Sequence, residues 1–322
     1  MKEIFRFIPH MQPTLWGGNK IARMKGIQST ENIGESWEIS GVDGCETIVA
    51  GGHFKGMPLN QLVATLKEQL LGEANYRRFG NHFPLLIKFI DARQDLSIQV
   101  HPNDEIAHRH GKPMGKTEMW YALPSEPGAQ LYNGLRQAIT PEKFQEMVEA
   151  KTITQALSKY DVNEGDVFFI PAGRVHAIGA GCMVAEIQQT SDVTYRIYDF
   201  DRRDSQGRLR ELHVKQAAEC IDYNVIEDYR TNYHPQTNKQ VTVVDCPFFT
   251  TGVVDVDGQV LLDYSHLDSF VILIGVSGEG AVCVNDQTEN IAVGQTLLLP
   301  ATANQVSVNG SLRLLETYIG HL

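Results

Sequence analysis

The segment Ser97–Asp104, with the sequence SIQVHPND, constrains this chain more than any other. Successive side chains of a β-strand point to opposite faces, so Ser97, Gln99 and His101 would share one face. The intervening isoleucine and valine would share the other face, and the proline that follows would end the strand, because it cannot donate to a β-ladder. An inward face with serine, glutamine and histidine needs partners for these polar groups. We therefore expect this strand to line a metal site or a polar pocket.

Two later segments carry residues that would complete such a site. The run GKTEMWY contains Lys116 and Glu118, and the run GDVFFIPAGRVH ends at His176. With Gln99 and His101, these residues would offer two oxygen and two nitrogen atoms. That set suits a divalent transition metal, above all zinc, with one position left open to water or substrate.

Length and composition limit the classes of protein to consider. The chain has 322 residues, 42% of them hydrophobic and 21% charged, which is ordinary for a globular protein and sufficient for two domains. A net charge of −11 argues against a nucleic-acid or membrane-surface binder. The N-terminus lacks the apolar core of an export signal, and no apolar run approaches membrane-spanning length. We expect a cytoplasmic protein, a monomer or homodimer, that binds neither nucleic acid nor membrane.

The cysteines are odd in number and far apart, without a CxxC pair. In the absence of an export signal they are expected to be reduced thiols. Cys182, which lies near the predicted site in sequence, is expected to be a small buried apolar residue. The five positions are Cys45, Cys182, Cys220, Cys246 and Cys283.

Most of the chain is expected to form strands, with a few short helices. Apolar residues at helical spacing predict helical segments near 58–79, with Gly72 as a stop. Thr140 as N-cap and Pro141 in the first turn predict a second helical region near 141–159. Both regions carry packing residues rather than chemistry.

The chain also contains an internal repeat. A glycine, an apolar strand and a proline precede His176, and the same arrangement precedes Gln305. The architecture is therefore expected to be duplicated, and the second copy lacks the histidine. The polar, aperiodic stretch 231–240 is predicted to be a linker.

Four runs in the chain resemble a known family. The pattern G-x5-P-x-G-x2-H is the second motif of the cupins, small double-sheet β-barrels. Within the cupins, the order and spacing of all four runs resemble type I mannose-6-phosphate isomerase, over nearly the whole chain. The runs are QVHPND at 99–104, KTEMW at 116–120, PAGRVHA at 171–177 and SDVTYR at 191–196.

The resemblance implies a mainly β fold of two cupin-type jelly-roll β-barrels with a few short helices. It predicts a catalytic cupin domain over residues 1–235 and a degenerate C-terminal cupin domain over 236–322, without metal ligands. The chain is too short for the large helical insertion of many relatives, so it resembles the compact bacterial form. Gly115 stands where relatives often have a histidine, so no role of that histidine is carried over.

The resemblance further implies an enzyme of carbohydrate metabolism that interconverts mannose 6-phosphate and fructose 6-phosphate through an enediol. It implies one Zn2+ per chain, held by Gln99, His101, Glu118 and His176. Either histidine alone would more often be a hydrogen-bonded core residue, so this prediction depends on the four residues together.

Moving a proton between C1 and C2 of the sugar phosphate requires a base, a group that stabilises negative charge and a phosphate anchor. Arg196 and Lys116 are candidates for both catalysis and substrate binding. Asp192 and Glu186 are candidate acid or base groups, and burial decides between them. Ser97 is a further candidate for substrate binding.

Several of these residues have structural alternatives. Arg196 could form an ion pair with Asp199, and Lys116 could be a solvated strand residue. Arg202 and Arg203 lie in a run of mixed charge, DFDRRD, and are expected on the solvated surface.

Two other functions remain open. An iron-dependent cupin oxygenase would share the fold, although such sites usually have more histidines and Gln99 counts against one. A non-catalytic sugar-binding cupin would hold a sugar phosphate without turnover. Metal analysis and a turnover assay would separate these alternatives.

Overall fold

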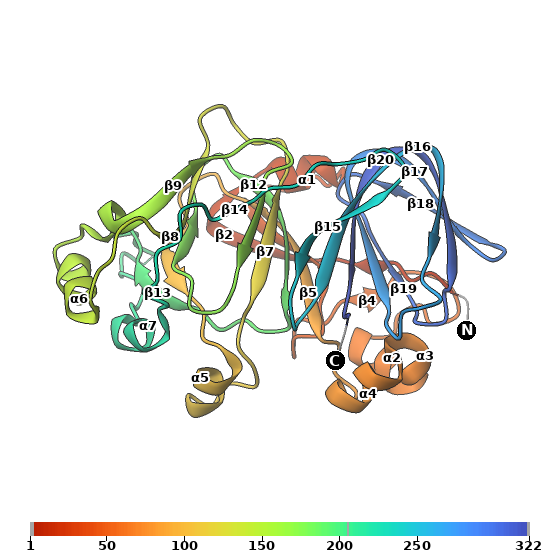
Figure 1. Ribbon diagram of the computed structural model, residues 1–322, viewed down its shortest axis with the longest axis horizontal. Helices are drawn as coiled ribbons and strands as arrows, with labels where there is room; N and C mark the ends of the chain where they lie inside the picture. Colours follow the sequence, from red (N-terminus) through yellow and green to blue (C-terminus); the bar gives the residue numbers. More distant parts are fainter. Residues whose placement is uncertain (1–2, 205, 321–322) are drawn as a thin grey trace. The chain divides into compact units, whose positions relative to one another are not determined.

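The computed structural model describes residues 3–204 and 206–320, and the chain divides into two compact units (Figure 1). Unit 1 consists of the segment up to Met11, Trp37–Lys88, and the chain from Asn232 onward. Unit 2 consists of Gln12–Ser36 and Phe89–Thr231. The predicted domain boundary between residues 235 and 236 stays a prediction.

Strands dominate, as predicted. A seven-stranded sheet has the order β14-β10-β7-β12-β5-β3-β2, and a five-stranded sheet has the order β13-β6-β11-β8-β9. The seven strands are β14 (Arg230–Thr231), β10 (Val167–Ile170), β7 (Glu118–Ala122), β12 (Met183–Gln189), β5 (Leu85–Asp91), β3 (Ile33–Ile39) and β2 (His10–Gly18). The five are β13 (Tyr195–Tyr198), β6 (Ile98–Val100), β11 (His176–Ile178), β8 (Gln130–Leu135) and β9 (Leu157–Asp161).

Side chains from both of these sheets meet in one buried cluster within unit 2. Trp120 and Phe168 enter it from the seven-stranded sheet, and Leu131 and Ile178 enter it from the five-stranded sheet. The two sheets therefore pack face to face. Burial of these large side chains removes apolar area from water, which is the main source of stability in such a sandwich.

The other face of the five-stranded sheet is covered by helices. Ile98 and Val100 of β6 belong to a second cluster, which also contains Phe144 of α6 (Pro141–Glu149) and Ala217 of α7 (Val214–Cys220). Apolar residues of β6 thus face the helices, and the alternating polar residues of this segment face the opposite sheet, as the sequence predicted.

The helical region predicted near 141–159 is shorter than expected. Thr140 caps α6 as predicted, with its hydroxyl accepting a hydrogen bond from the Lys143 backbone N–H at 3.2 Å. Lys151 then adopts a left-handed conformation with φ of 57°, which ends the helix. A single 3-10 turn, η1 (Ile153–Ala156), follows, and residues 157–159 lie in β9, paired with β8. The prediction was wrong there because tertiary strand pairing overrides local helix preference.

Unit 1 contains a six-stranded sheet with its own core. The order is β15-β16-β20-β17-β18, and β19 pairs with β17. Valine and leucine side chains from these strands form the core. The strands are β15 (Gln240–Asp245), β16 (Thr250–Asp263), β20 (Gln305–Tyr318), β17 (Val271–Val284), β18 (Gln287–Ala292) and β19 (Thr296–Leu299).

The sequence repeat corresponds to a structural one. In the first copy β10 leads through a turn to β11, which begins at His176, and in the second copy β19 leads to β20, which begins at Gln305. His176 is completely buried, whereas Gln305 is exposed. The second copy thus keeps the strand-turn-strand arrangement without placing a ligand inside.

The remaining elements are short. The helical region predicted near 58–79 contains three helices, separated at Lys67 and Gly72, both of which have positive φ. These helices are α2 (Leu59–Leu66), α3 (Glu68–Leu71) and α4 (Glu73–Phe79); the other elements are α1 (Lys20–Met24), α5 (Asp104–Arg109), β1 (Phe7–Ile8) and β4 (Ile48–Val49).

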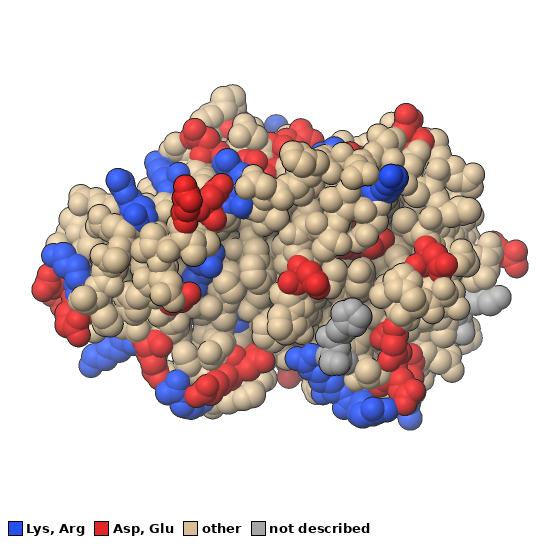
Figure 2. Space-filling view, in the orientation of Figure 1, with Lys and Arg blue, Asp and Glu red and all other residues tan. Residues whose placement is uncertain are grey.

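The distribution of surface charge and the unpaired state of the cysteines agree with what the composition predicted. On the face shown in Figure 2, acidic and basic side chains are scattered among neutral ones rather than gathered into a basic patch. All five cysteines are unpaired, and Cys182 is fully buried as predicted. Among the helices of residues 3–204 and 206–320, none has the length and apolar character that a membrane crossing requires.

Candidate metal centre and its surroundings

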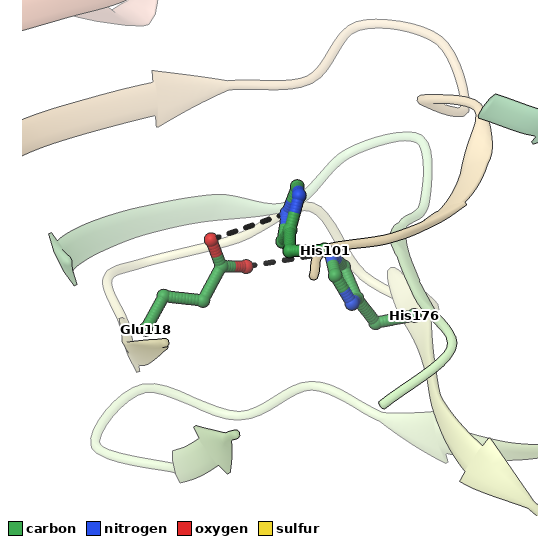
Figure 3. A group of neighbouring side chains, drawn as sticks. All are labelled: His101, Glu118 and His176. Atoms are coloured by element: carbon green, nitrogen blue, oxygen red, sulfur yellow. Dashed lines mark ion pairs between the residues drawn. The ribbon is translucent and has the colours of Figure 1, made fainter. Parts of the chain in front are cut away.

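Three strands of unit 2 bring His101, Glu118 and His176 together. His101 directly follows β6, Glu118 begins β7 and His176 begins β11. Each side chain offers a ligand atom, these atoms all lie within 4.8 Å of one another, and all three residues are buried. The two oxygens of the Glu118 carboxylate face the two imidazoles, at 3.4 Å from each Nε2 atom (Figure 3).

Backbone carbonyls orient both imidazoles. His101 Nδ1 lies 2.8 Å from the Val193 carbonyl oxygen, and His176 Nδ1 lies 2.8 Å from the Arg174 carbonyl oxygen. A carbonyl only accepts hydrogen bonds, so Nδ1 carries the proton and the Nε2 lone pair points toward Glu118. Burial lowers the pKa of His176 to about 3, so this ring is neutral at physiological pH. Such outer hydrogen bonds are how proteins fix histidine ligands of metals.

The chemistry of this cluster fits a divalent metal. Glu118 Oε1 is buried and accepts no hydrogen bond from any other described residue. A cation beside it would satisfy this oxygen together with the two imidazole lone pairs. Gln99 lies next to the cluster, because it is the direct partner of His176 across the antiparallel pair β6–β11. The Gln99 amide nitrogen is 3.3 Å from His176 Nε2.

Lys116 and Glu186 adjoin the metal cluster. Lys116 Nζ lies 2.5 Å from Glu118 Oε2, 3.2 Å from His101 Nε2 and 3.8 Å from Glu186 Oε1. Burial alone would lower the pKa of Lys116, but the carboxylates of Glu118 and Glu186 outweigh it, and the pKa is raised. Lys116 is 4% exposed, so the alternative of a solvated strand lysine is wrong.

The other predicted residues lie in different surroundings. Arg196 is the direct partner of Gln99 across the pair β13–β6, so both side chains lie on the same sheet face. Ser97 is buried, with its hydroxyl 3.3 Å from Gln99 Oε1. Asp192 is exposed, whereas Glu186 is 3% exposed.

Asp199 pairs with an arginine that the sequence analysis did not single out. Arg210 Nε and Nη2 donate to the two Asp199 carboxylate oxygens at 2.6 and 2.5 Å, which is a bidentate pair. Arg196 instead donates from Nη1 to the Glu211 carbonyl oxygen at 2.9 Å. Nothing in the local sequence distinguished Arg210 from other surface arginines, because its role depends on the approach of two loops.

Arg202 also joins this group. Its side chain is only 11% exposed, and Nη1 lies 3.6 Å from Asp199 Oδ1. The expectation of a solvated position is therefore wrong for Arg202, although Arg203 is exposed as expected. Burial and then the positive charge of Arg210 lower the pKa of Arg196, and burial lowers that of Arg202. Arg202 and Arg210 thus share the Asp199 carboxylate, and Arg196 lies close enough to Arg210 for its pKa to be affected.

Two further residues were missed. Trp120 donates a hydrogen bond from its indole Nε1 to Glu186 Oε2 at 2.8 Å. Lys88 is buried in the middle of β5, with Nζ 4.7 Å from the centroid of the Trp37 ring. Its signal in the sequence is a lysine inside the apolar run LLIKFI, where a cation needs a specific reason to be buried.

Comparison with known proteins agrees with this geometry. Residues 4–131 match the profile of the catalytic domain of type I phosphomannose isomerase, and residues 239–319 match that of the mannose-6-phosphate isomerase cupin domain. The chain is 34% identical to mannose-6-phosphate isomerase ManA of Bacillus subtilis, over 98% of both chains. It is also 34% identical to mannose-6-phosphate isomerase of Streptococcus mutans, over 96% of both chains.

Solved structures show the same fold. The crystal structure of the mannose 6-phosphate isomerase from Bacillus subtilis matches with a TM-score of 0.89 and 29% identity, and covers the whole of both chains. A putative mannosephosphate isomerase from Archaeoglobus fulgidus matches with a TM-score of 0.81 at 22% identity, over the whole of this chain and 99% of that one. The family profiles and the full-length relatives agree with the buried histidine–glutamate cluster. The chain therefore belongs to the type I mannose-6-phosphate isomerase family.

Proposed function

We propose that this protein is a zinc-dependent aldose–ketose isomerase that interconverts mannose 6-phosphate and fructose 6-phosphate through an enediol. The observation that carries the proposal is the buried cluster of His101, Glu118 and His176, with ligand atoms within 4.8 Å of one another and two cations alongside. The names of the full-length relatives support the same reaction.

Gln99, His101, Glu118 and His176 would hold the zinc ion. Two imidazole nitrogens, one carboxylate and one amide oxygen suit zinc and would leave the centre with a net positive charge. When bound, the metal would supply a Lewis acid that polarises a sugar oxygen. The neutral state of His176 supports this role, because a protonated imidazole cannot ligate.

Burial supports Glu186 rather than Asp192 as the group that moves the proton between C1 and C2. Glu186 is buried beside Lys116, whereas Asp192 is exposed to water. The contacts of Glu186 with Lys116 and Trp120 fix its position, which favours proton transfer. Lys116, held between two carboxylates, would stabilise the negative oxygen of the enediol as an ammonium.

The arginine group would anchor the phosphate. Arg196 Nε and Arg202 Nη1 are buried and have no hydrogen-bond partner among the described residues. Arg210 already forms a bidentate pair with the Asp199 carboxylate. The positive charges of Arg196 and Arg202 are therefore not balanced by a bidentate partner of their own and could bind an anionic ligand. A phosphate would satisfy both orphan donors. Arg196 is the strand partner of Gln99, so the sugar would extend from the arginine group, which holds its phosphate on C6, toward the metal, where C1 and C2 react, with Ser97 in reach of the same face.

The finer predictions about the fold belong to the same proposal. Each half would be a cupin-type jelly-roll barrel, with the catalytic domain over 1–235 and the degenerate domain over 236–322. The exposed Gln305 supports the loss of the metal site in the second domain. Within the described residues, the only cluster of histidine, cysteine and acidic side chains suited to a metal is the one in the first domain.

The test is turnover by the purified, zinc-loaded protein. Mannose 6-phosphate should yield fructose 6-phosphate and the reverse, a chelator should abolish the reaction, and added zinc should restore it. Zinc-loaded protein that leaves both sugar phosphates unchanged would overturn the proposal. Iron in the freshly purified protein with oxygen consumption would indicate the oxygenase alternative, and binding of the sugar phosphate without turnover would indicate a sugar-binding cupin.

A further inference from the structure

We propose that Trp120 is a positioning residue of this active site. Its indole N–H fixes one oxygen of the Glu186 carboxylate, so that the other oxygen is held toward Lys116 and the substrate. The inference rests on the proposed function, in which Glu186 moves the proton. Nothing in the metal ligand set requires a tryptophan at this position.

The geometry couples these two side chains directly. Trp120 on β7 and Glu186 on β12 are partners across an antiparallel pair, so their side chains project from the same sheet face. Indole Nε1 donates to Glu186 Oε2 at 2.8 Å, while Oε1 lies 3.8 Å from Lys116 Nζ. The indole N–H can only donate a hydrogen bond, and an ionised carboxylate oxygen can only accept one. The donor and acceptor of this pair are therefore fixed.

The indole is itself held rigidly. Trp120 is 1% exposed, and its ring meets the His176 imidazole edge-on at 5.3 Å between centroids. Phe168 is its direct strand partner on β10 and belongs to the same buried cluster. Close packing leaves the indole no room to turn away. Trp120 therefore contacts a metal-binding histidine with its ring and the proton-transferring carboxylate with its N–H.

This arrangement should act on the chemical step rather than on substrate binding. Proton transfer depends on the alignment of the base, and a misplaced carboxylate loses rate even when the substrate still binds. A hydrogen bond to a charged group contributes more than one between neutral groups. Loss of the N–H alone should therefore lower kcat and leave KM nearly unchanged.

The first experiment compares Trp120→Phe with the zinc-loaded wild type. Phenylalanine keeps an aromatic ring in the core but lacks the donor, so kcat should fall about ten- to hundredfold. KM and zinc content should stay close to those of the wild type. Leu131→Val is the matched control: Leu131 belongs to the same buried cluster but lies on the five-stranded sheet, where its strand partners are Ile178 and Tyr160, so this change should lower the melting temperature and leave kcat unchanged.

A double-mutant cycle separates positioning from packing. If Trp120 acts through Glu186, Trp120→Phe should have no further effect on kcat in a Glu186→Gln background. Independent, multiplying effects would overturn the proposal. So would a kcat of Trp120→Phe within about twofold of wild type, or a loss of zinc that accounts for the lost rate.

A spectroscopic measurement covers the case in which Trp120→Phe does not fold. The chain has three tryptophans, so the indole N–H region of a nitrogen-15 spectrum is simple to assign. Glu186→Gln should move the Trp120 indole signal and speed its hydrogen exchange, because a neutral amide is a weaker acceptor. An unchanged signal would overturn the inference. Absence of turnover in the wild type would instead overturn the proposed function and leave the Trp120–Glu186 hydrogen bond testable.

Discussion

Gln99 and His176 face each other across the β6–β11 pair with their nitrogen atoms 3.3 Å apart. The Gln99 oxygen lies instead 3.3 Å from the Ser97 hydroxyl. A metal binds the oxygen of an amide, so Gln99 would act as a ligand only after a half-turn of its amide group, which exchanges the two atoms within the same volume. The Ser97 hydroxyl can accept from the amide nitrogen as well as donate to the oxygen. Ser97 therefore supports either orientation.

Gln99→Leu should weaken zinc binding while the histidine ligands remain. We expect the zinc affinity to be at least about tenfold lower, because leucine lacks both the amide oxygen and the polar contact that orients it. Competition against a chelator of known affinity measures this. Gln130→Leu, a matched change on strand β8 of the same sheet, should leave the affinity as in the wild type. Equal zinc affinity in Gln99→Leu and wild type would remove Gln99 from the ligand set.

His101→Ala and His176→Ala should each lose the metal. Turnover should fall by roughly three orders of magnitude, because Lewis-acid stabilisation is worth several kcal/mol. Metal analysis of the purified variants measures the first effect and a steady-state assay the second. His110→Ala is the control: His110 pairs with Glu219 outside the cluster, so zinc content and kcat should be unchanged. Zinc retained at full occupancy in either ligand variant would contradict the assignment.

The candidate metal cluster of His101, Glu118 and His176 could be predicted from sequence because its signal is local. Alternation along β6 puts Gln99 and His101 on one face whatever the rest of the chain does. The glycine and proline before His176 fix a turn that returns the chain at the end of a strand. Four such residues in three separate runs then predict one site.

The surroundings of the cluster could not be predicted, because they depend on distant contacts. The run of mixed charge around Arg202 is typical of a solvated surface, yet its side chain is largely covered where it approaches Asp199. The link from Trp120 to Glu186 exists only in the register of β7 against β12. The end of α6 likewise depends on β9 pairing with β8, which a local helix pattern does not contain.

Arg202→Ala should impair substrate binding without loss of the metal. KM for mannose 6-phosphate should rise roughly tenfold or more, since a charged hydrogen bond to phosphate contributes about 1.5–3 kcal/mol. Arg196→Ala should retain zinc and lose turnover, because this arginine is the strand partner of Gln99 beside the candidate metal cluster. Arg203→Ala, the exposed neighbour, is the control and should behave as the wild type. An unchanged KM in Arg202→Ala would exclude it as a phosphate anchor.

Zinc should stabilise the folded protein. A ligand that binds only the folded state adds about 2.7 kcal/mol at a free concentration one hundred times its Kd. The melting temperature of the wild type should therefore rise by several degrees with zinc and fall again with a chelator. His176→Ala should show no such rise. A zinc-dependent shift of equal size in both proteins would place the stabilising ion elsewhere.

A carboxyl group remote in sequence from the metal ligands should make stability depend on pH. Glu316 lies on β20 in unit 1 and is 3% exposed, and its carboxylate accepts a hydrogen bond from the Tyr264 hydroxyl. Burial raises the pKa of Glu316 to about 7, and the tyrosine hydrogen bond opposes this only in part. Unfolding returns the carboxyl to water, where its pKa is near 4.5.

Because the folded pKa of Glu316 is the higher one, the protonated carboxyl stabilises the fold. This contribution is fully present below about pH 4.5 and is lost as the pH rises to about 7, by at most about 1.4 kcal/mol per pH unit. Glu316→Gln removes the titration and keeps a group that can pair with Tyr264. Urea unfolding of both proteins between pH 5 and 8 should show the wild type losing stability relative to the variant as the pH rises. Parallel pH profiles would mean that Glu316 is ionised in the folded protein, and its burial would then need a second, cationic partner.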